Sequence, residues 1–158
     1  MAAVFTGTPV AITWAAGADP AAQNITVPAD ATAVYLVWAY YNGADGHGLA
    51  SATLAGANPS QTFEAPTAPD DEAATGIAVW YNPPTGTQSL DVAWDAAPEE
   101  GPTSMVFYTK DGHTSAWRDA DGANEDGTAA VSVTLTTVAG DLVVKFDQRF
   151  ANPNTAPP

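Results

Sequence analysis

Short runs of β-branched and aromatic residues, separated by clusters of Gly, Pro, Asn and Asp, recur along the chain. The runs follow one another at intervals of roughly 10 to 20 residues, and helical periodicity is nearly absent. The thirteen prolines and thirteen glycines lie mostly in the connections, where they preset turn dihedrals and interrupt backbone ladders. This pattern predicts an all-β fold, specifically an antiparallel β-sandwich of jelly-roll-like type.

The runs predict a series of strands within one domain over residues 1–150, followed by an extended Pro- and Asn-rich tail over residues 151–158. The last two strands are expected to form a closing hairpin, because the first of them alternates apolar and hydroxyl side chains and a turn follows it directly. The expected strands lie near Val10–Ala15, Asn24–Val27, Ala33–Tyr41, Ala50–Leu54, Gln61–Glu64, Ile77–Asn82, Ser89–Trp94, Ser104–Thr109, Ala130–Thr137 and Leu142–Asp147.

Residues 76–94, GIAVWYNPPTGTQSLDVAW, contain two aromatic-rich strands joined by a proline-stiffened turn. We expect a hairpin whose strands bury one apolar set across the pair. On this interpretation Tyr81 and Trp94 are core residues. Trp80 falls on the opposite face, where it either packs beneath a loop or belongs to a contact surface.

The segment Ala33–Tyr41 has apolar side chains on both of its faces. Such a strand is either central and covered on both sides by sheet and loops, or one of its faces contacts another subunit. On the second interpretation Tyr40 is a partner-binding residue.

The chain is strongly acidic: eighteen Asp and Glu residues against four Lys and Arg residues give a formal net charge of -14. This charge repels phosphate backbones and anionic membrane surfaces. The cations are scattered and form no basic patch; they are Lys110, Arg118, Lys145 and Arg149. We therefore expect neither a nucleic-acid partner nor a membrane partner.

The chain contains no cysteine, which excludes disulfide frameworks, thiolate metal sites and cysteine nucleophiles. Residues 1–14 do not combine a cationic region with a continuous apolar stretch, so no secretory signal is expected. No apolar segment reaches the length needed to span a bilayer. We expect a protein that is made soluble in the cytoplasm.

Residues suited to catalysis are present but form no recognisable pattern. Both histidines, His47 and His113, lie in glycine-containing segments that are typical of exposed turns. A carboxylate pair could hydrolyse glycosides, and Glu64, Asp91 and Asp95 are candidates, but carboxylates at strand edges usually serve solubility. We predict that the protein is not an enzyme.

Two long connections, residues 65–75 and 111–128, exceed the usual loop length, and such loops are typically functional or disordered. The second places Trp117 beside Arg118 among acidic residues. An aromatic side chain in a polar loop is costly unless it packs or binds. Trp117 and Arg118 are therefore candidate binding residues.

The same loop offers oxygen ligands of the kind that calcium prefers. They are Asp119, Asp121, Asn124, Glu125 and Asp126. Their spacing lacks the sixth-position glycine and the twelfth-position glutamate of an EF-hand. This pattern requires no cofactor. The segment is either a solvated acidic loop or a calcium site.

An ordered series of segments resembles a β-sandwich module that is frequent in tailed-phage virion proteins and bacterial surface proteins. The segments are ITVPADATAVYLVW, ATLAG, IAVWYNPPTGTQSLDVAW, SMVFYT and AAVSVTLTTVAGDLVV. They cover roughly residues 23–146, and residues 82–86 (NPPTG) and 139–143 (AGDLV) are the most specific parts.

The resemblance implies a non-enzymatic virion structural protein, assembled in the host cytoplasm and used in head decorations, spikes or fibres. We expect a head decoration or spike subunit that binds the capsid or other virion proteins, alone or as a homo-oligomer. Loop 111–128 is longer than the connections of that family. The alternative is a carbohydrate-binding, host-adhesion module in which an exposed Trp or Tyr, Trp117 above all, stacks on a cell-surface glycan.

Overall fold

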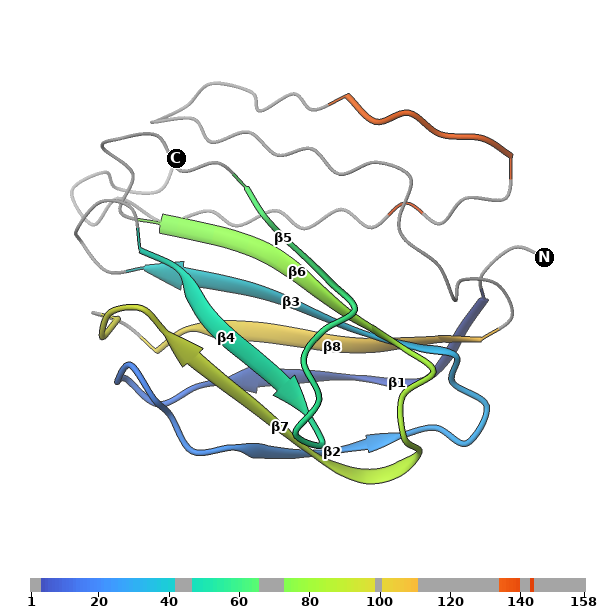
Figure 1. Ribbon diagram of the computed structural model, residues 1–158, viewed down its shortest axis with the longest axis horizontal. Helices are drawn as coiled ribbons and strands as arrows, with labels where there is room; N and C mark the ends of the chain where they lie inside the picture. Colours follow the sequence, from blue (N-terminus) through green and yellow to red (C-terminus); the bar gives the residue numbers. More distant parts are fainter. Residues whose placement is uncertain are drawn as a thin grey trace, which may run out of the picture.

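The computed structural model describes residues 4–41, 47–65, 73–98, 101–110, 134–139 and 143. These residues form two antiparallel sheets that pack face to face (Figure 1), so the predicted antiparallel β-sandwich is confirmed. The five-stranded sheet has the order β1-β8-β3-β6-β5 and the three-stranded sheet the order β2-β7-β4. The strands are β1 (Val4–Thr13), β2 (Gln23–Val27), β3 (Ala33–Tyr41), β4 (Leu49–Leu54), β5 (Gln61–Glu64), β6 (Ala73–Tyr81), β7 (Gly86–Trp94) and β8 (Thr103–Lys110).

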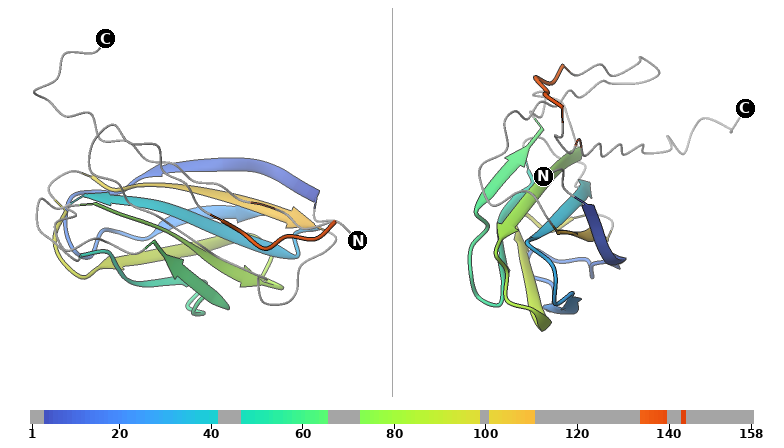
Figure 2. Two further views of the ribbon diagram at one scale, coloured as in Figure 1. Left: turned by 90° about the horizontal axis from the view of Figure 1, so that it is seen from above. Right: turned by 90° about the vertical axis from the view of Figure 1, so that its right-hand side faces the viewer.

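Successive strands mostly alternate between the two sheets, as in the winding of a jelly roll. Among the described strands, β5 and β6 are the consecutive pair that lies in one sheet, with Phe63 opposite Ile77. Figure 2 shows the two layers from two further directions. This winding brings the first described strand, β1, beside the last one, β8.

Strand β1 begins at Val4, earlier than the predicted start at Val10. Val4 to Thr6 already pair with β8, and the register then shifts before pairing resumes at Val10. Gly7 takes a φ of 67° at this irregularity. The intervening Gly-Thr-Pro reads as a turn in the sequence, but here it forms a bulge within an edge strand, where proline is tolerated.

Strand β3 is central, as its two apolar faces indicated. It pairs with β6 on one side and β8 on the other. Its inner face packs in the core between the sheets, where Trp38 is fully buried. Its outer face carries Tyr35, which stacks on Phe107 with ring centroids 4.8 Å apart.

The predicted hairpin over residues 76–94 is wrong. Strand β6 belongs to the five-stranded sheet and β7 to the three-stranded sheet, so the two strands do not pair. Asn82, in the left-handed region at φ 51°, donates its N–H to the Thr32 carbonyl at 2.8 Å. Because Pro83 and Pro84 have no N–H to offer a ladder, the connection turns the chain across the sandwich.

The face assignment changes with the topology. Trp80 lies in the core between the sheets, together with Trp94, which was predicted correctly. Tyr81, expected to share that core, is half-buried on the outer face of the five-stranded sheet, packed against the cluster that contains Val79 and Phe107.

The closing hairpin expected from Ala130–Thr137 and Leu142–Asp147 lies largely outside the described residues, and so does the tail over residues 151–158. The described residues 134–139 carry no strand. The described residues also include no helix that is long and apolar enough to cross a membrane.

Candidate functional site

Two of the predicted binding residues are buried side chains of the core. Trp80 is 3% exposed and donates its indole Nε1–H to the Ala57 carbonyl at 2.9 Å. Tyr40 is 0% exposed, and its hydroxyl donates to the Ala96 carbonyl at 3.0 Å. Both rings therefore pack within the protein core, which for Trp80 is the packing alternative rather than the contact surface. The face of β3 that carries Tyr40 lies in the core between the sheets.

The other predicted binding residues lie outside the described part of the chain. These are Trp117 and Arg118, the calcium candidates Asp119, Asp121 and Asp126, and also His113. Within the described residues, no group of three or more His, Asp or Glu side chains is arranged to hold a metal ion.

A polar cluster of His47, Glu64 and Asp95 lies where β4 begins, β5 ends and β7 ends. The Asp95 carboxylate accepts the Gly48 N–H at 2.8 Å, and the Asp95 N–H donates to the Gly48 carbonyl at 3.1 Å. His47 places Nδ1 3.4 Å from the same carboxylate oxygen. The Glu64 carboxylate packs so closely on Gly48 that a Cβ at residue 48 would overlap it.

This cluster joins the two sheets at one edge, because Glu64 comes from the five-stranded sheet and Asp95 follows a strand of the three-stranded sheet. Burial raises the pKa of Glu64, and the negative charge of Asp95 raises it further. Asp95 is engaged as an acceptor for backbone N–H, so its geometry fits a structural role. The expectation that His47 lies exposed in a turn is met only in part, since its side chain is 37% exposed and paired.

Replacing Glu64 with glutamine should stabilise the protein at neutral pH. The folded-state pKa of Glu64 is raised above its ordinary value, so ionisation costs stability as the pH rises through that folded pKa. Below pH 4.5 the two proteins should unfold alike, and above the raised pKa E64Q should be more stable, by up to about 1 kcal/mol at this half-exposed site. Urea unfolding between pH 4 and pH 8 measures the difference. A variant that is less stable than the parent at neutral pH would contradict this account.

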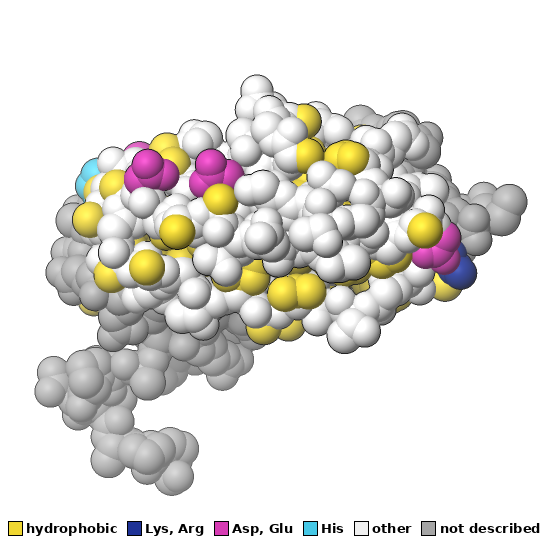
Figure 3. All heavy atoms as spheres, turned by 90° about the horizontal axis from the view of Figure 1, so that it is seen from below, with side chains coloured by type: hydrophobic (Ala, Val, Ile, Leu, Met, Phe, Trp, Pro, Cys, Tyr) yellow, Lys and Arg dark blue, Asp and Glu magenta, His cyan; other side chains and the backbone are white. Residues whose placement is uncertain are grey.

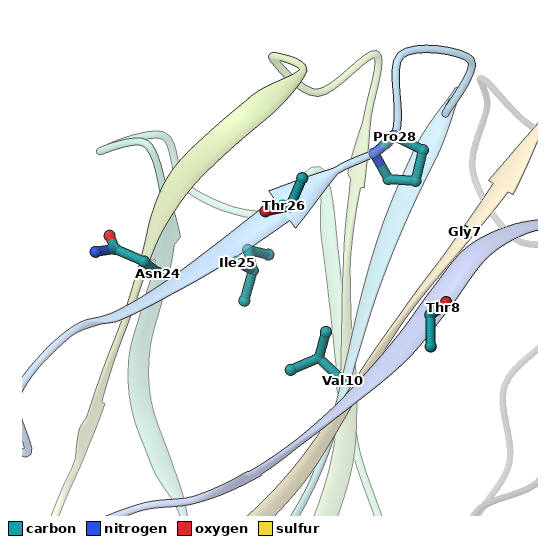
Figure 4. Close-up of a pocket in the computed structure, with 7 residues that line it drawn as sticks. All are labelled: Gly7, Thr8, Val10, Asn24, Ile25, Thr26 and Pro28. Atoms are coloured by element: carbon teal, nitrogen blue, oxygen red, sulfur yellow. The ribbon is translucent and has the colours of Figure 1, made fainter.

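A groove lies between β1 and β2, where an edge strand of one sheet faces an edge strand of the other (Figure 4). Its volume is about 430 Å³ and it is open to solvent. The lining residues are Gly7, Thr8, Val10, Asn24, Ile25, Thr26 and Pro28. A Cβ at residue 7 would lie 2.5 Å from Cγ of Pro28, so glycine permits β1 to approach β2 at this point.

The described residues that line the groove include no charged side chain. Figure 3 shows the described charges at the two ends of the face over β1, β2 and β7, with uncharged surface between them. One end holds the ion pair of Lys110 and Asp30, whose charged atoms are 3.1 Å apart. Thr6 also donates to Asp30 at 2.8 Å, and these two contacts lower the pKa of Asp30.

Sequence reasoning did not find the groove, because its walls are strands distant in the chain that become neighbours only through the sheet order. The available signals were Gly7-Thr8-Pro9 inside an apolar run and Pro28 directly after Val27. Comparison of the chain with protein-family models, with curated proteins and with solved structures finds no match.

Proposed function

We propose that the protein is a non-enzymatic structural protein of a phage-type virion, a head decoration or spike subunit that binds the capsid surface. The observation that carries the proposal is where the segments of the resemblance lie in the fold. ITVPADATAVYLVW covers most of β2, all but the end of β3, and the connection between them, and IAVWYNPPTGTQSLDVAW covers most of β6, β7 and the crossing between the sheets. The most specific described part, residues 82–86, is the turn that carries the chain from one sheet to the other.

The side chains of the described residues support a binding scaffold. The four described tryptophans, Trp14, Trp38, Trp80 and Trp94, pack in the core between the sheets. The described charges lie mainly on exposed turns and strand ends. A net charge of -14 would keep coated particles mutually repulsive. These features suit a subunit that assembles on a surface.

Mass spectrometry of purified particles from the source of this sequence tests the proposal. We expect the polypeptide in the particles, and we expect the isolated protein to bind particles from which it has been removed. Particles that never contain it would overturn the proposal. A glycan array that binds the protein, with the signal lost in Trp117→Ala, would favour the carbohydrate-binding module instead.

A further inference from the structure

Among the described strands β2 pairs with β7 alone, so its other edge directs unpaired backbone groups at the groove. Asn24 lies opposite Ser89 of β7. The Ser89 carbonyl, however, accepts the N–H of Ala55, on the far side of β7, at 2.8 Å. In an antiparallel strand both backbone groups of a residue point to the same neighbour, so Asn24 and Ser89 form a non-hydrogen-bonded pair. Asn24, and Thr26 two residues later, therefore direct their N–H and C=O groups away from β7, towards the groove.

The part of β1 that forms the opposite wall of the groove offers few backbone groups for hydrogen bonding. The Trp14 N–H bonds to the Pro102 carbonyl at 2.8 Å, so the residues in phase with Trp14, including Val10, face β8. Pro9 has no N–H, and the bulge at residues 7–9 interrupts the ladder. The groove thus has a hydrogen-bonding edge on β2 and a wall on β1 that carries Val10.

Free edges in natural sheets are usually protected by charged side chains, proline or a covering segment. The exposed side chains of β2 next to its free edge are Asn24 and Thr26, which carry no charge. The strand itself contains no proline. The groove is open to solvent, so an extended segment can reach the edge of β2.

We propose that the groove accepts an extended, neutral or basic segment of another protein, which adds beside β2 as a fourth strand of the three-stranded sheet. The backbone of this segment pairs with Asn24 and Thr26, as in peptide recognition by strand addition. Alternate side chains of the segment point into the groove towards Val10 and Ile25. These side chains are apolar, because Val10 and Ile25, which they face, are apolar.

The net charge of the protein determines which kind of segment the groove binds best. A net charge of -14 attracts a basic segment and repels an acidic one, a second copy of this chain included. The inference concerns the binding chemistry of β2 and does not depend on a virion partner. It is tested with purified protein, so it can fail while the virion proposal stands, and the reverse also holds.

The test is an NMR titration of the ¹⁵N-labelled full chain with the capped peptide acetyl-Lys-Thr-Val-Thr-Val-Thr-Lys-amide. We expect the amide signals of Asn24 and Thr26 to shift saturably, with a dissociation constant of about 1 mM or tighter. The same peptide with glutamate in place of lysine should bind more weakly, and added salt should reduce this difference. A peptide N-methylated on alternate residues should not bind, because it cannot pair with β2.

Thr26→Pro removes a groove-facing N–H without removing a hydrogen bond to β7, and its ring obstructs the edge. It should weaken binding at least about tenfold. Thr13→Pro is the control: it places proline on the free edge of β1, in the phase that faces away from β8 and outside the groove, and should leave binding unchanged.

Circular dichroism of each variant confirms that it folds. Absence of any shift at Asn24 and Thr26 with peptide in excess would overturn the proposal. Shifts that are confined to other strands, or binding that survives Thr26→Pro undiminished, would do the same.

Discussion

Replacing Trp80 with alanine should lower the free energy of unfolding by about 3 to 5 kcal/mol, as expected when a large buried aromatic side chain is truncated. Trp80 is 3% exposed in the core between the sheets. The truncation leaves a cavity there and also removes one of the two donors to the Ala57 carbonyl, the other being the Leu54 N–H. Guanidinium unfolding followed by circular dichroism measures the loss.

Trp80→Phe is the matched control, since it keeps an aromatic ring and loses the indole N–H. It should cost less than the alanine variant, about 0.5 to 1.5 kcal/mol for the lost hydrogen bond, because the Ala57 carbonyl keeps the Leu54 N–H as a donor. An alanine variant as stable as the parent protein would mean that Trp80 contributes little to the core. That result would favour the alternative from the sequence, in which Trp80 belongs to a contact surface.

Replacing Gly76 with alanine should have the second-largest effect, a loss of about 3 kcal/mol, at the upper end of what overpacking usually costs. A Cβ at residue 76 would lie 2.6 Å from the backbone oxygen of Phe63 and would overlap the ring of Trp38. Neither neighbour can yield easily, because Phe63 is held in β5 and the Trp38 ring is fully buried. Chemical denaturation of the single variant measures the loss.

Combining Gly76→Ala with Trp38→Phe separates the two obstacles. The smaller ring should relieve part of the overlap, so the double variant should be more stable than the sum of the single changes predicts. If the free-energy changes of the two single variants simply add, the Trp38 ring does not obstruct a Cβ at residue 76. A Gly76→Ala protein of unchanged stability would contradict the close packing of β6 on the core.

The positions and type of most strands followed from alternation in the sequence, but their partners did not. The alternation in β6 correctly separated Trp80 from Ile77, Val79 and Tyr81. Both sets are apolar, however, and the pattern does not say which of them faces the second sheet. The Pro83-Pro84 turn suggested a local hairpin because neighbouring strands commonly pair, whereas here the turn crosses between sheets.

Long-range contacts account for the remaining differences. The cluster of His47, Glu64 and Asp95 joins segments that lie far apart in the chain, and its members looked like separate exposed charges in the sequence. The groove between β1 and β2 arises in the same way, from the order of strands within each sheet. Tyr40 looked like a contact residue because a strand with two apolar faces does not reveal that both faces are covered within one molecule.

The pairing of β1 with β8 has a consequence for the timing of synthesis. Val4 pairs with Lys110, so the first strand leaves the ribosome long before its partner exists. At ordinary rates of translation this interval is about 5 to 20 s. During this time β1 is an apolar segment with two open edges, and the Gly-Thr-Pro bulge in its middle keeps it from being a long, flat template for other nascent chains. The bulge that shapes the groove in the folded protein therefore also reduces the risk of aggregation during synthesis.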